Sequence, residues 1–187
     1  MNIDNPKSKN IMVTSIMAMS INGRITRQDE MDVKSWTSLE DKEFFESILY
    51  KAESVIMGSN TFTATLKTKV PKYRRRLTVV LSHSPENFSE YSVEGVREFW
   101  NKSALETTEK LKNMGIKTAL LLGGSRLNSE FFEAGLVDEL WLTIEPKIFG
   151  KGKLLIEDFE SFELNFRLES HIQLNDSGTL LLHYVKI

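Results

Sequence analysis

The sequence predicts one α/β domain built on a mixed, mostly parallel β-sheet with helices on both faces. Its 187 residues suit one domain, at the usual scale of roughly 150 residues per domain. Apolar runs of strand length alternate with amphipathic segments of helical spacing, a pattern typical of parallel strands joined by crossover helices. The last part of the chain is rich in strands, and two of them flank a strong turn, which predicts an antiparallel hairpin at one edge of the sheet.

The first half of the domain is predicted to hold three strands around a capped helix. Residues 1–10 are polar and are expected to form a flexible tail before a single domain of residues 11–187. The run 11–20 fits a buried strand, and Asn22-Gly23 follows it as a turn in which glycine supplies a positive φ. Ser38 is expected to cap a helix whose apolar residues recur at helical spacing up to Ala52, and short strands are expected at 54–57 and 77–81.

The second half is predicted to add two helices and four strands. Ser103 and Glu106 form a capping box for a helix that stops at Gly115, and a shorter helix closes at Gly135. The hairpin turn is the segment Asn175–Gly178. Strands are expected at 118–122, 140–144, 166–172 and 179–185.

Composition and charge argue against nucleic acid, metal and membrane as partners, and a small-molecule substrate is expected. The net charge is 24 − 26 = −2, so no long-range positive field attracts nucleic acid, and the basic run 72–76 is interpreted as a solvated loop. There is no cysteine, and the three histidines lack metal-binding spacing. No run approaches the ~18 apolar residues of a membrane span. We therefore expect a cytoplasmic protein that binds neither metal, membrane nor nucleic acid.

Two glycine-containing junctions between a strand and a helix are the first candidates for a binding site. The segments Gly58–Thr61 and Gly123–Arg126 each let the backbone approach a ligand closely and present free N–H groups of a helix N-terminus to an anion. Arg126 adds a positive charge at the second junction. Neither segment is a dinucleotide-binding G-x-G-x-x-G or a Walker loop, so ATP chemistry and an ordinary Rossmann domain are disfavoured.

Asp41 is the second candidate, and two interpretations of it are open. Its spacing from Phe45, Ile48 and Ala52 places it on the apolar face of the predicted helix. A buried carboxyl has a raised pKa, which suits a proton donor or a partner for an N–H-rich ring. Alternatively, Asp41 stands three residues after Ser38 and serves only the capping box and the helix dipole.

Taken in their order along the chain, these motifs resemble the superfamily that includes dihydrofolate reductase and the reductases of riboflavin biosynthesis. In the riboflavin branch this domain is the RibD C-terminal domain. The resemblance covers the chain from about residue 11 to 187. It is carried by four segments: Ala18–Ile25, Leu121–Asn128, Gly135–Leu140 and Pro146–Gly150. It implies a dihydrofolate reductase-like three-layer α/β/α fold and a reductase that uses NADPH.

The resemblance also implies roles for individual residues. Ala18 would meet the nicotinamide, while Ser82 and Arg126 would approach the adenosine 2′-phosphate. The phosphates and the pyrophosphate would be held at the two junctions, by Gly58, Ser59, Thr61, Gly123, Gly124 and Ser125. These junctions are the ones that the residues themselves single out.

The substrate differs between the two branches of the superfamily, and the sequence matches each in part. Residues that resemble the folate pocket are Asp41, Trp36, Phe45, Thr143 and Arg76. The segment 136–150 instead resembles the riboflavin branch, although Leu122, Leu49 and Glu53 replace residues usual there, and Asn22 replaces the usual Asp. We expect an NADPH-dependent reductase of a pyrimidine or pteridine, with Asp41 as its catalytic residue. Alternatives are a dihydrofolate reductase and an NADP-binding protein without turnover, and a homodimer is expected from the family.

Overall fold

The structure is a computed structural model that describes residues 11–28, 30, 33–66, 76–157 and 162–187. The predicted tail of residues 1–10 and most of the basic run 72–76 lie outside the described residues. Two short 3-10 helices, η1 (Val33–Ser35) and η2 (Pro85–Tyr91), accompany the main elements. The α-helices are α1 (Leu39–Lys51), α2 (Ser59–Leu66), α3 (Ala104–Asn113) and α4 (Ser125–Glu133). The strands are β1 (Met12–Ser20), β2 (Ser54–Gly58), β3 (Leu77–Leu81), β4 (Arg97–Trp100), β5 (Thr118–Leu121), β6 (Glu139–Glu145), β7 (Phe166–Gln173) and β8 (Leu180–Lys186).

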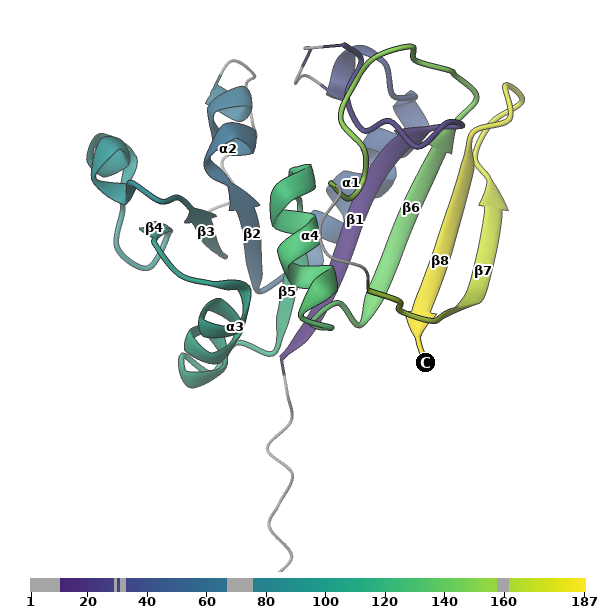
Figure 1. The fold of residues 1–187 in the computed structure, drawn as a ribbon. Coiled ribbons are helices and arrows are strands. Elements are labelled where there is room, and N and C mark those ends of the chain that lie inside the picture. The colour runs from purple at the N-terminus through teal and green to yellow at the C-terminus, as the bar shows by residue number, and fades with distance from the viewer. Residues whose placement is uncertain (1–10, 29, 31–32, 67–75, 158–161) are drawn as a thin grey trace, which may run out of the picture.

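The eight strands found in the described residues lie in one sheet, in the order β4-β3-β2-β5-β1-β6-β8-β7 (Figure 1). The six strands from β4 to β6 are parallel to their neighbours. β8 runs antiparallel to β6, and β7 antiparallel to β8. The mixed sheet with its C-terminal antiparallel hairpin is therefore confirmed. β4 was not predicted, because it begins with the charged residues Arg97 and Glu98 and shows no apolar run of strand length.

Two helices cover each face of the sheet, which gives three layers. Figure 1 shows α3 and α4 in front of the sheet and α1 behind it. Leu121 and Phe131 are fully buried in the core between the sheet and the front helices. Leu49 of α1 and Phe62 of α2 are buried against the opposite face. Burying a side chain of this size stabilises the fold by about 1.5–3 kcal/mol.

Local signals in the sequence explain where the main helices begin. Ser38 caps α1 by accepting a hydrogen bond from the Asp41 backbone N–H at 3.2 Å. Ser103 and Glu106 form the complete capping box of α3. The turn before β8 closes as predicted, with Gly178 at φ +91° donating its N–H to the Asn175 carbonyl. Among the described residues, no helix is both long and apolar enough to cross a membrane.

Candidate active site

The two glycine junctions lie side by side at the carboxyl ends of β2 and β5. These strands are neighbours in the sheet, and the Gly58 N–H donates to the Gly123 carbonyl at 2.8 Å. A Cβ on Gly58 would stand 3.8 Å from that carbonyl oxygen and 3.9 Å from the Gly124 nitrogen. Gly58 thus places no side chain between two adjacent helix N-termini, at the edge of the sheet where open α/β sheets bind their ligands.

The groups around the Gly58 and Gly123 junctions fit an anion such as a phosphate. The N-cap of α4 is Gly124, which provides no side-chain cap for the first backbone N–H groups of the helix. Ser125 is 1% exposed, and its hydroxyl has no hydrogen-bond partner among the described residues. Thr61 of α2 faces Gly124, since its Oγ1 would lie 3.5 Å from a Cβ there. The unpartnered Ser125 hydroxyl and the uncapped N-terminus of α4 are suited to an anionic group.

Ser82 and Arg126 flank the junctions. Ser82 follows β3, and its hydroxyl accepts a hydrogen bond from the Ser84 N–H at 3.1 Å. Arg126 lies in the first turn of α4, has a largely exposed side chain and pairs loosely with Glu130 at 3.7 Å. Both residues therefore lie at the same edge of the sheet as the junctions.

Ala18 separates the glycine junctions from Asp41. It lies on β1, between β5 with its Gly123 junction and β6, and it is paired with Thr143 of β6 in the sheet register. Neighbouring strands are about 4.8 Å apart, so a ligand on β1 at Ala18 lies within reach of both sides. Ala18 is half-buried, and its methyl group is the smallest side chain that a residue other than glycine can present there.

Asp41 is buried on the face of α1 that packs on the sheet, at 9% exposure. Burial raises the pKa of its carboxyl above the ordinary value, and the negative charge of Glu145 raises this pKa further. Hydrogen bonds with the side chains of Thr143 and Thr37 lower the pKa in part. The result is a carboxyl that favours its protonated form more than an exposed aspartate does.

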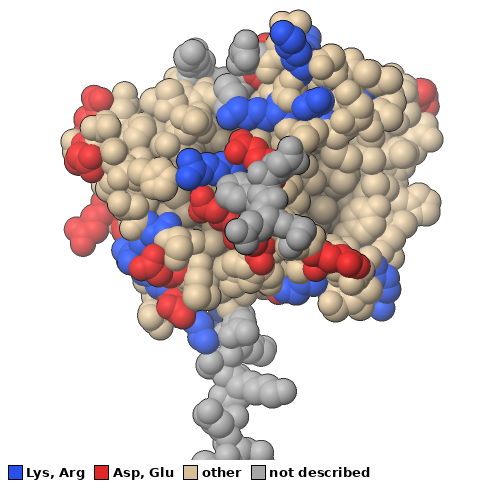
Figure 2. Space-filling model, viewed as in Figure 1, with Lys and Arg blue, Asp and Glu red and all other residues tan. Residues whose placement is uncertain are grey.

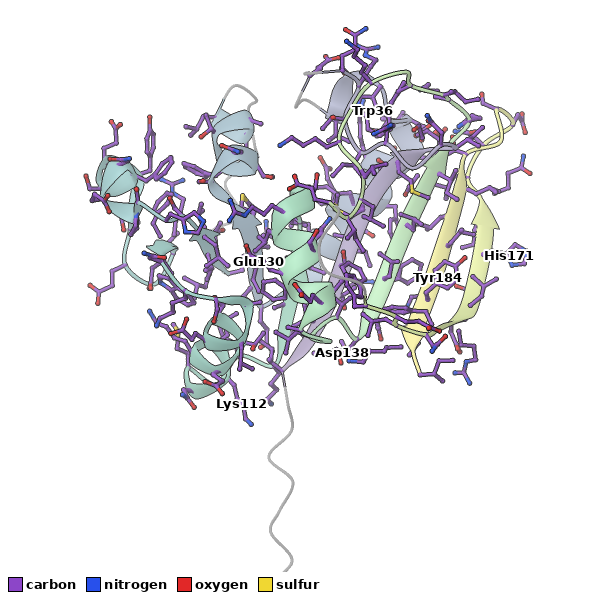
Figure 3. The ribbon with its side chains drawn as sticks, in the orientation of Figure 1. Trp36, Lys112, Glu130, Asp138, His171 and Tyr184 are labelled. Atoms are coloured by element: carbon purple, nitrogen blue, oxygen red, sulfur yellow. The ribbon has the colours of Figure 1, made fainter. Side chains whose placement is uncertain are left out.

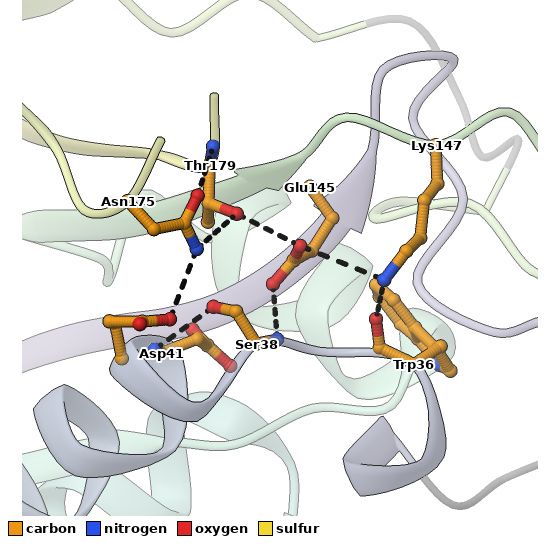
Figure 4. A network of polar contacts seen from close by, with 8 residues as sticks. Trp36, Ser38, Asp41, Glu145, Lys147, Asn175 and Thr179 are labelled. Carbon is orange, nitrogen blue, oxygen red and sulfur yellow. Dashed lines mark hydrogen bonds and ion pairs between the residues drawn. The ribbon is translucent and has the colours of Figure 1, made fainter. Parts of the chain in front are cut away.

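The carboxyl of Asp41 does not serve the helix cap. Ser38 donates its backbone N–H to Glu145 Oε1 at 2.6 Å, so the bond that a capping box would make to residue 41 goes to β6 instead. Figure 4 shows Glu145 between Ser38 and Thr179, with Asp41 on the neighbouring turn of α1. The capping interpretation therefore accounts for the Asp41 backbone but not for its side chain.

Of the other residues of the predicted substrate site, Trp36 and Phe45 belong to the segment before α1 and to α1 itself, and Arg76 lies at the far end of that helix from Asp41. Trp36 is 3% exposed, packs edge-on against Phe149 at 5.2 Å, and lies near the carboxyl end of β1 (Figure 3). Phe45 is half-buried near Leu49 on the inner face of α1. Arg76 lies apart from Asp41, because it donates to the Leu49 carbonyl, eight residues or about 12 Å further along the helix.

Sequence reasoning missed three residues around Asp41. Thr37 bonds the Asp41 carboxyl, Glu145 is 2% exposed, and the Thr179 hydroxyl donates to Glu145 Oε2 at 3.1 Å. A signal was present, because Thr143 and Glu145 alternate along β6 and therefore share the face toward α1. Their partners lie 34 to 107 residues away in the sequence, which pattern analysis does not bridge.

Neither a metal site nor a one-sided charge accompanies these groups in the part of the chain that the structure describes. Within the described ranges, no three side chains of His, Asp or Glu gather in a way that could hold a metal ion. Acidic and basic side chains are mixed over the face drawn in Figure 2, and neither sign covers it. The described groups of the site are thus a buried carboxyl and two glycine junctions at helix N-termini.

The chain belongs to the family of the RibD C-terminal domain, whose model matches residues 11–180. YwjB of Bacillus subtilis, an uncharacterized protein, is 25% identical over 172 residues, which cover 91% of this chain and 95% of YwjB. The family is the one that the segments around Gly123 and Pro146 predicted.

Solved structures confirm the dihydrofolate reductase-like fold. The bifunctional deaminase and 5-amino-6-(5-phosphoribosylamino)uracil reductase of Thermotoga maritima superimposes with a TM-score of 0.72 at 19% identity, over 96% of this chain and 57% of that one. Dihydrofolate reductase of Enterococcus faecalis, in complex with NADP(H) and RAB-propyl, gives a TM-score of 0.67 at 21% identity, over 94% of this chain and 96% of that one.

Proposed function

We propose that this protein is an NADPH-dependent reductase that acts on a pyrimidine or pteridine with a reducible C=N bond. One observation carries the proposal: the buried carboxyl of Asp41 and the pair of glycine junctions at Gly58 and Gly123 lie on opposite sides of Ala18. The first is suited to an N–H-rich ring and the second to phosphates. A reductase of this family needs both, at one edge of the sheet.

The residues fit NADPH, and their tasks divide by position. The N-termini of α2 and α4, with Thr61 and Ser125, would hold the phosphates. Ala18 would lie beside the nicotinamide, and Ser82 and Arg126 beside the adenosine. When bound, NADPH would supply the hydride, and the protein's contribution is to hold two rings in contact within a site from which water is excluded.

Asp41 would supply the proton. Its carboxyl would bind the amino and ring N–H groups of the substrate and, in its protonated form, donate a proton directly or through water to the ring nitrogen. Thr143 and Thr37 orient the carboxyl by hydrogen bonding. Proton donation of this kind contributes roughly 10²–10⁴-fold to the rate.

A test is the oxidation of NADPH, measured as absorbance at 340 nm, with two substrates in parallel: dihydrofolate and the ribosylaminouracil phosphate of the riboflavin pathway. Turnover of either supports a reductase. Absence of turnover with both substrates, in a protein that binds NADPH, would instead support the alternative of an NADP-binding protein without turnover.

The second candidate function is dihydrofolate reduction, which the hydrogen bond between Asp41 and Thr143 favours. The Leu49 carbonyl to which Arg76 donates lies about 12 Å along α1 from Asp41. Only an elongated substrate would therefore contact both Asp41 and Arg76. Arg76→Gln is expected to raise KM for dihydrofolate at least tenfold if the guanidinium binds its carboxylate. An unchanged KM would remove Arg76 from the substrate site.

We also propose that the protein is a homodimer that pairs through the C-terminal hairpin. β7 is the edge strand, and seven of its eight residues are exposed. Leu168 and Ile172 are apolar and about half exposed, and exposed apolar edge strands are normally covered. Light scattering after size-exclusion chromatography should give a dimer mass, and Ile172→Lys should reduce it to the mass of a monomer.

A further inference from the structure

Glu145 is a buried acid that the proposed reaction does not use directly. Its side chain is 2% exposed, at the carboxyl end of β6. Burying a carboxylate is unfavourable unless donors surround it. The Ser38 N–H donates to it at 2.6 Å and the Thr179 hydroxyl at 3.1 Å, and the Lys147 ammonium forms an ion pair with it at 3.9 Å. Such a cluster has to be explained.

The cluster joins separate parts of the fold around Asp41. Ser38 is the residue that caps α1, so the bond to Glu145 fixes the first turn of the helix, including Asp41, against β6. On the other side, Thr179 connects Glu145 to Asn175, whose Nδ2 donates to Thr179 Oγ1 at 3.1 Å and to Glu40 Oε2 at 3.0 Å. Figure 4 shows that these bonds close around the start of α1.

Neighbouring charged side chains also influence the pKa of the Asp41 carboxyl. The neighbouring charged groups are Glu40 and Lys42 on its own helix, Glu145 on β6 and Lys147 just beyond β6. β1 contributes no ionisable side chain. Lys42 lowers the pKa of Asp41, whereas Glu145 raises it after burial.

We propose that Glu145 is a positioning residue of the Asp41 site, which holds the first turn of α1 against β6 by a hydrogen bond and acts on the Asp41 carboxyl through its negative charge. The consequence for turnover rests on the proposed function. The consequences for the Ser38 backbone and for the Asp41 carboxyl do not, and they are measurable in the free protein.

Glu145→Gln separates the two effects. The amide has the shape of the carboxylate, and its oxygen still accepts from the Ser38 N–H, while the hydroxyl of Thr179 can reverse its bond. Only the charge is lost. Glu145→Ala removes the acceptor as well. The matched control is Glu139→Gln, the same substitution on the same strand and face, roughly 20 Å away at the strand rise and paired with His183 instead.

The decisive experiment is a ¹³C NMR titration of the side-chain carboxyl carbons, with the Asp41 signal assigned by its loss in Asp41→Asn. Asp41 should titrate at a lower pH in Glu145→Gln than in the wild type, and at the wild-type pH in Glu139→Gln. Equal midpoints in all three proteins would overturn the electrostatic part.

Hydrogen exchange of the Ser38 amide should be at least tenfold faster in Glu145→Ala and unchanged in Glu145→Gln. Equal protection in both would overturn the positioning part.

The pH dependence of NADPH oxidation connects this inference with the proposed function. On the alkaline side, turnover falls about tenfold per pH unit when a single protonated acid is required. In Glu145→Gln this fall should begin at lower pH, with KM for NADPH unchanged. If no substrate is reduced, the proposed function fails and the NMR titration still decides the role of Glu145. If turnover occurs and its pH profile does not move, only the inference about Glu145 fails.

Discussion

The side-chain amide of Asn22 bonds both backbone groups of Phe149: Nδ2 donates to the carbonyl at 2.8 Å, and Oδ1 accepts from the N–H at 3.2 Å. The pair ties the turn after β1 to the segment after β6. An aspartate in place of Asn22 would have no N–H to donate to that carbonyl.

Asn22→Asp should therefore loosen these loops. The carboxylate would face the Phe149 carbonyl without a donor, so one hydrogen bond is lost and two acceptors repel. We expect the free energy of unfolding to fall by about 0.5–1.5 kcal/mol, measured by urea denaturation. If the Asn22→Asp variant is as stable as the wild type, the pair contributes nothing. Asn87→Asp, at a site without this bonding pattern, is the control.

Gly58→Ala should weaken cofactor binding without affecting the fold. Its added methyl group would have ordinary contacts with the backbone at 3.8–3.9 Å, so the melting temperature should change little. The same methyl group would occupy the space that we assign to the phosphates, and Kd for NADPH should rise at least tenfold. Isothermal titration calorimetry measures this. The control is Gly150→Ala, where a Cβ meets nothing within 4 Å; equal affinities in both variants would place the phosphates elsewhere.

The raised pKa of Asp41 should make the stability of the protein depend on pH. Its folded-state pKa is raised by burial and by Glu145, so folding favours the protonated form. The stability from this group is complete below the unfolded pKa, near 3.8, and is lost as the pH rises through the folded pKa. Asp41→Asn should thus be more stable than the wild type at pH 8 and should lose this advantage toward pH 4, in melting temperatures measured across that range.

Thr143→Val should shift the same carboxyl in the other direction from Glu145→Gln. The hydroxyl of Thr143 lowers the pKa of Asp41 by hydrogen bonding, and valine keeps the shape while removing the bond. The ¹³C titration of Asp41 should then move to higher pH. A midpoint below that of the wild type would contradict the placement of Thr143 beside the carboxyl.

Local patterns in the sequence predicted most of the fold, since Ser38, the Ser103 capping box and the turn at Gly178 act through residues a few positions away. The apolar spacing around Phe45 also predicted that Asp41 is buried. β4 was missed because its sequence begins with two charged residues, Arg97 and Glu98, and shows no apolar run of strand length. Glu145 was missed for another reason: its burial depends on Ser38 and Thr179, whose contacts with it arise only from the pairing of distant strands.

The most direct test of the account compares Asp41→Asn with the wild type in NADPH oxidation, using the substrate that the wild type reduces, and in NADPH binding. Because the introduced asparagine keeps the shape of the side chain but cannot donate the acid proton, we predict that kcat falls by about 10²–10⁴-fold, with Kd for NADPH unchanged. An equal loss in turnover and in NADPH affinity, or no loss in turnover, would contradict the role of Asp41 as the proton donor.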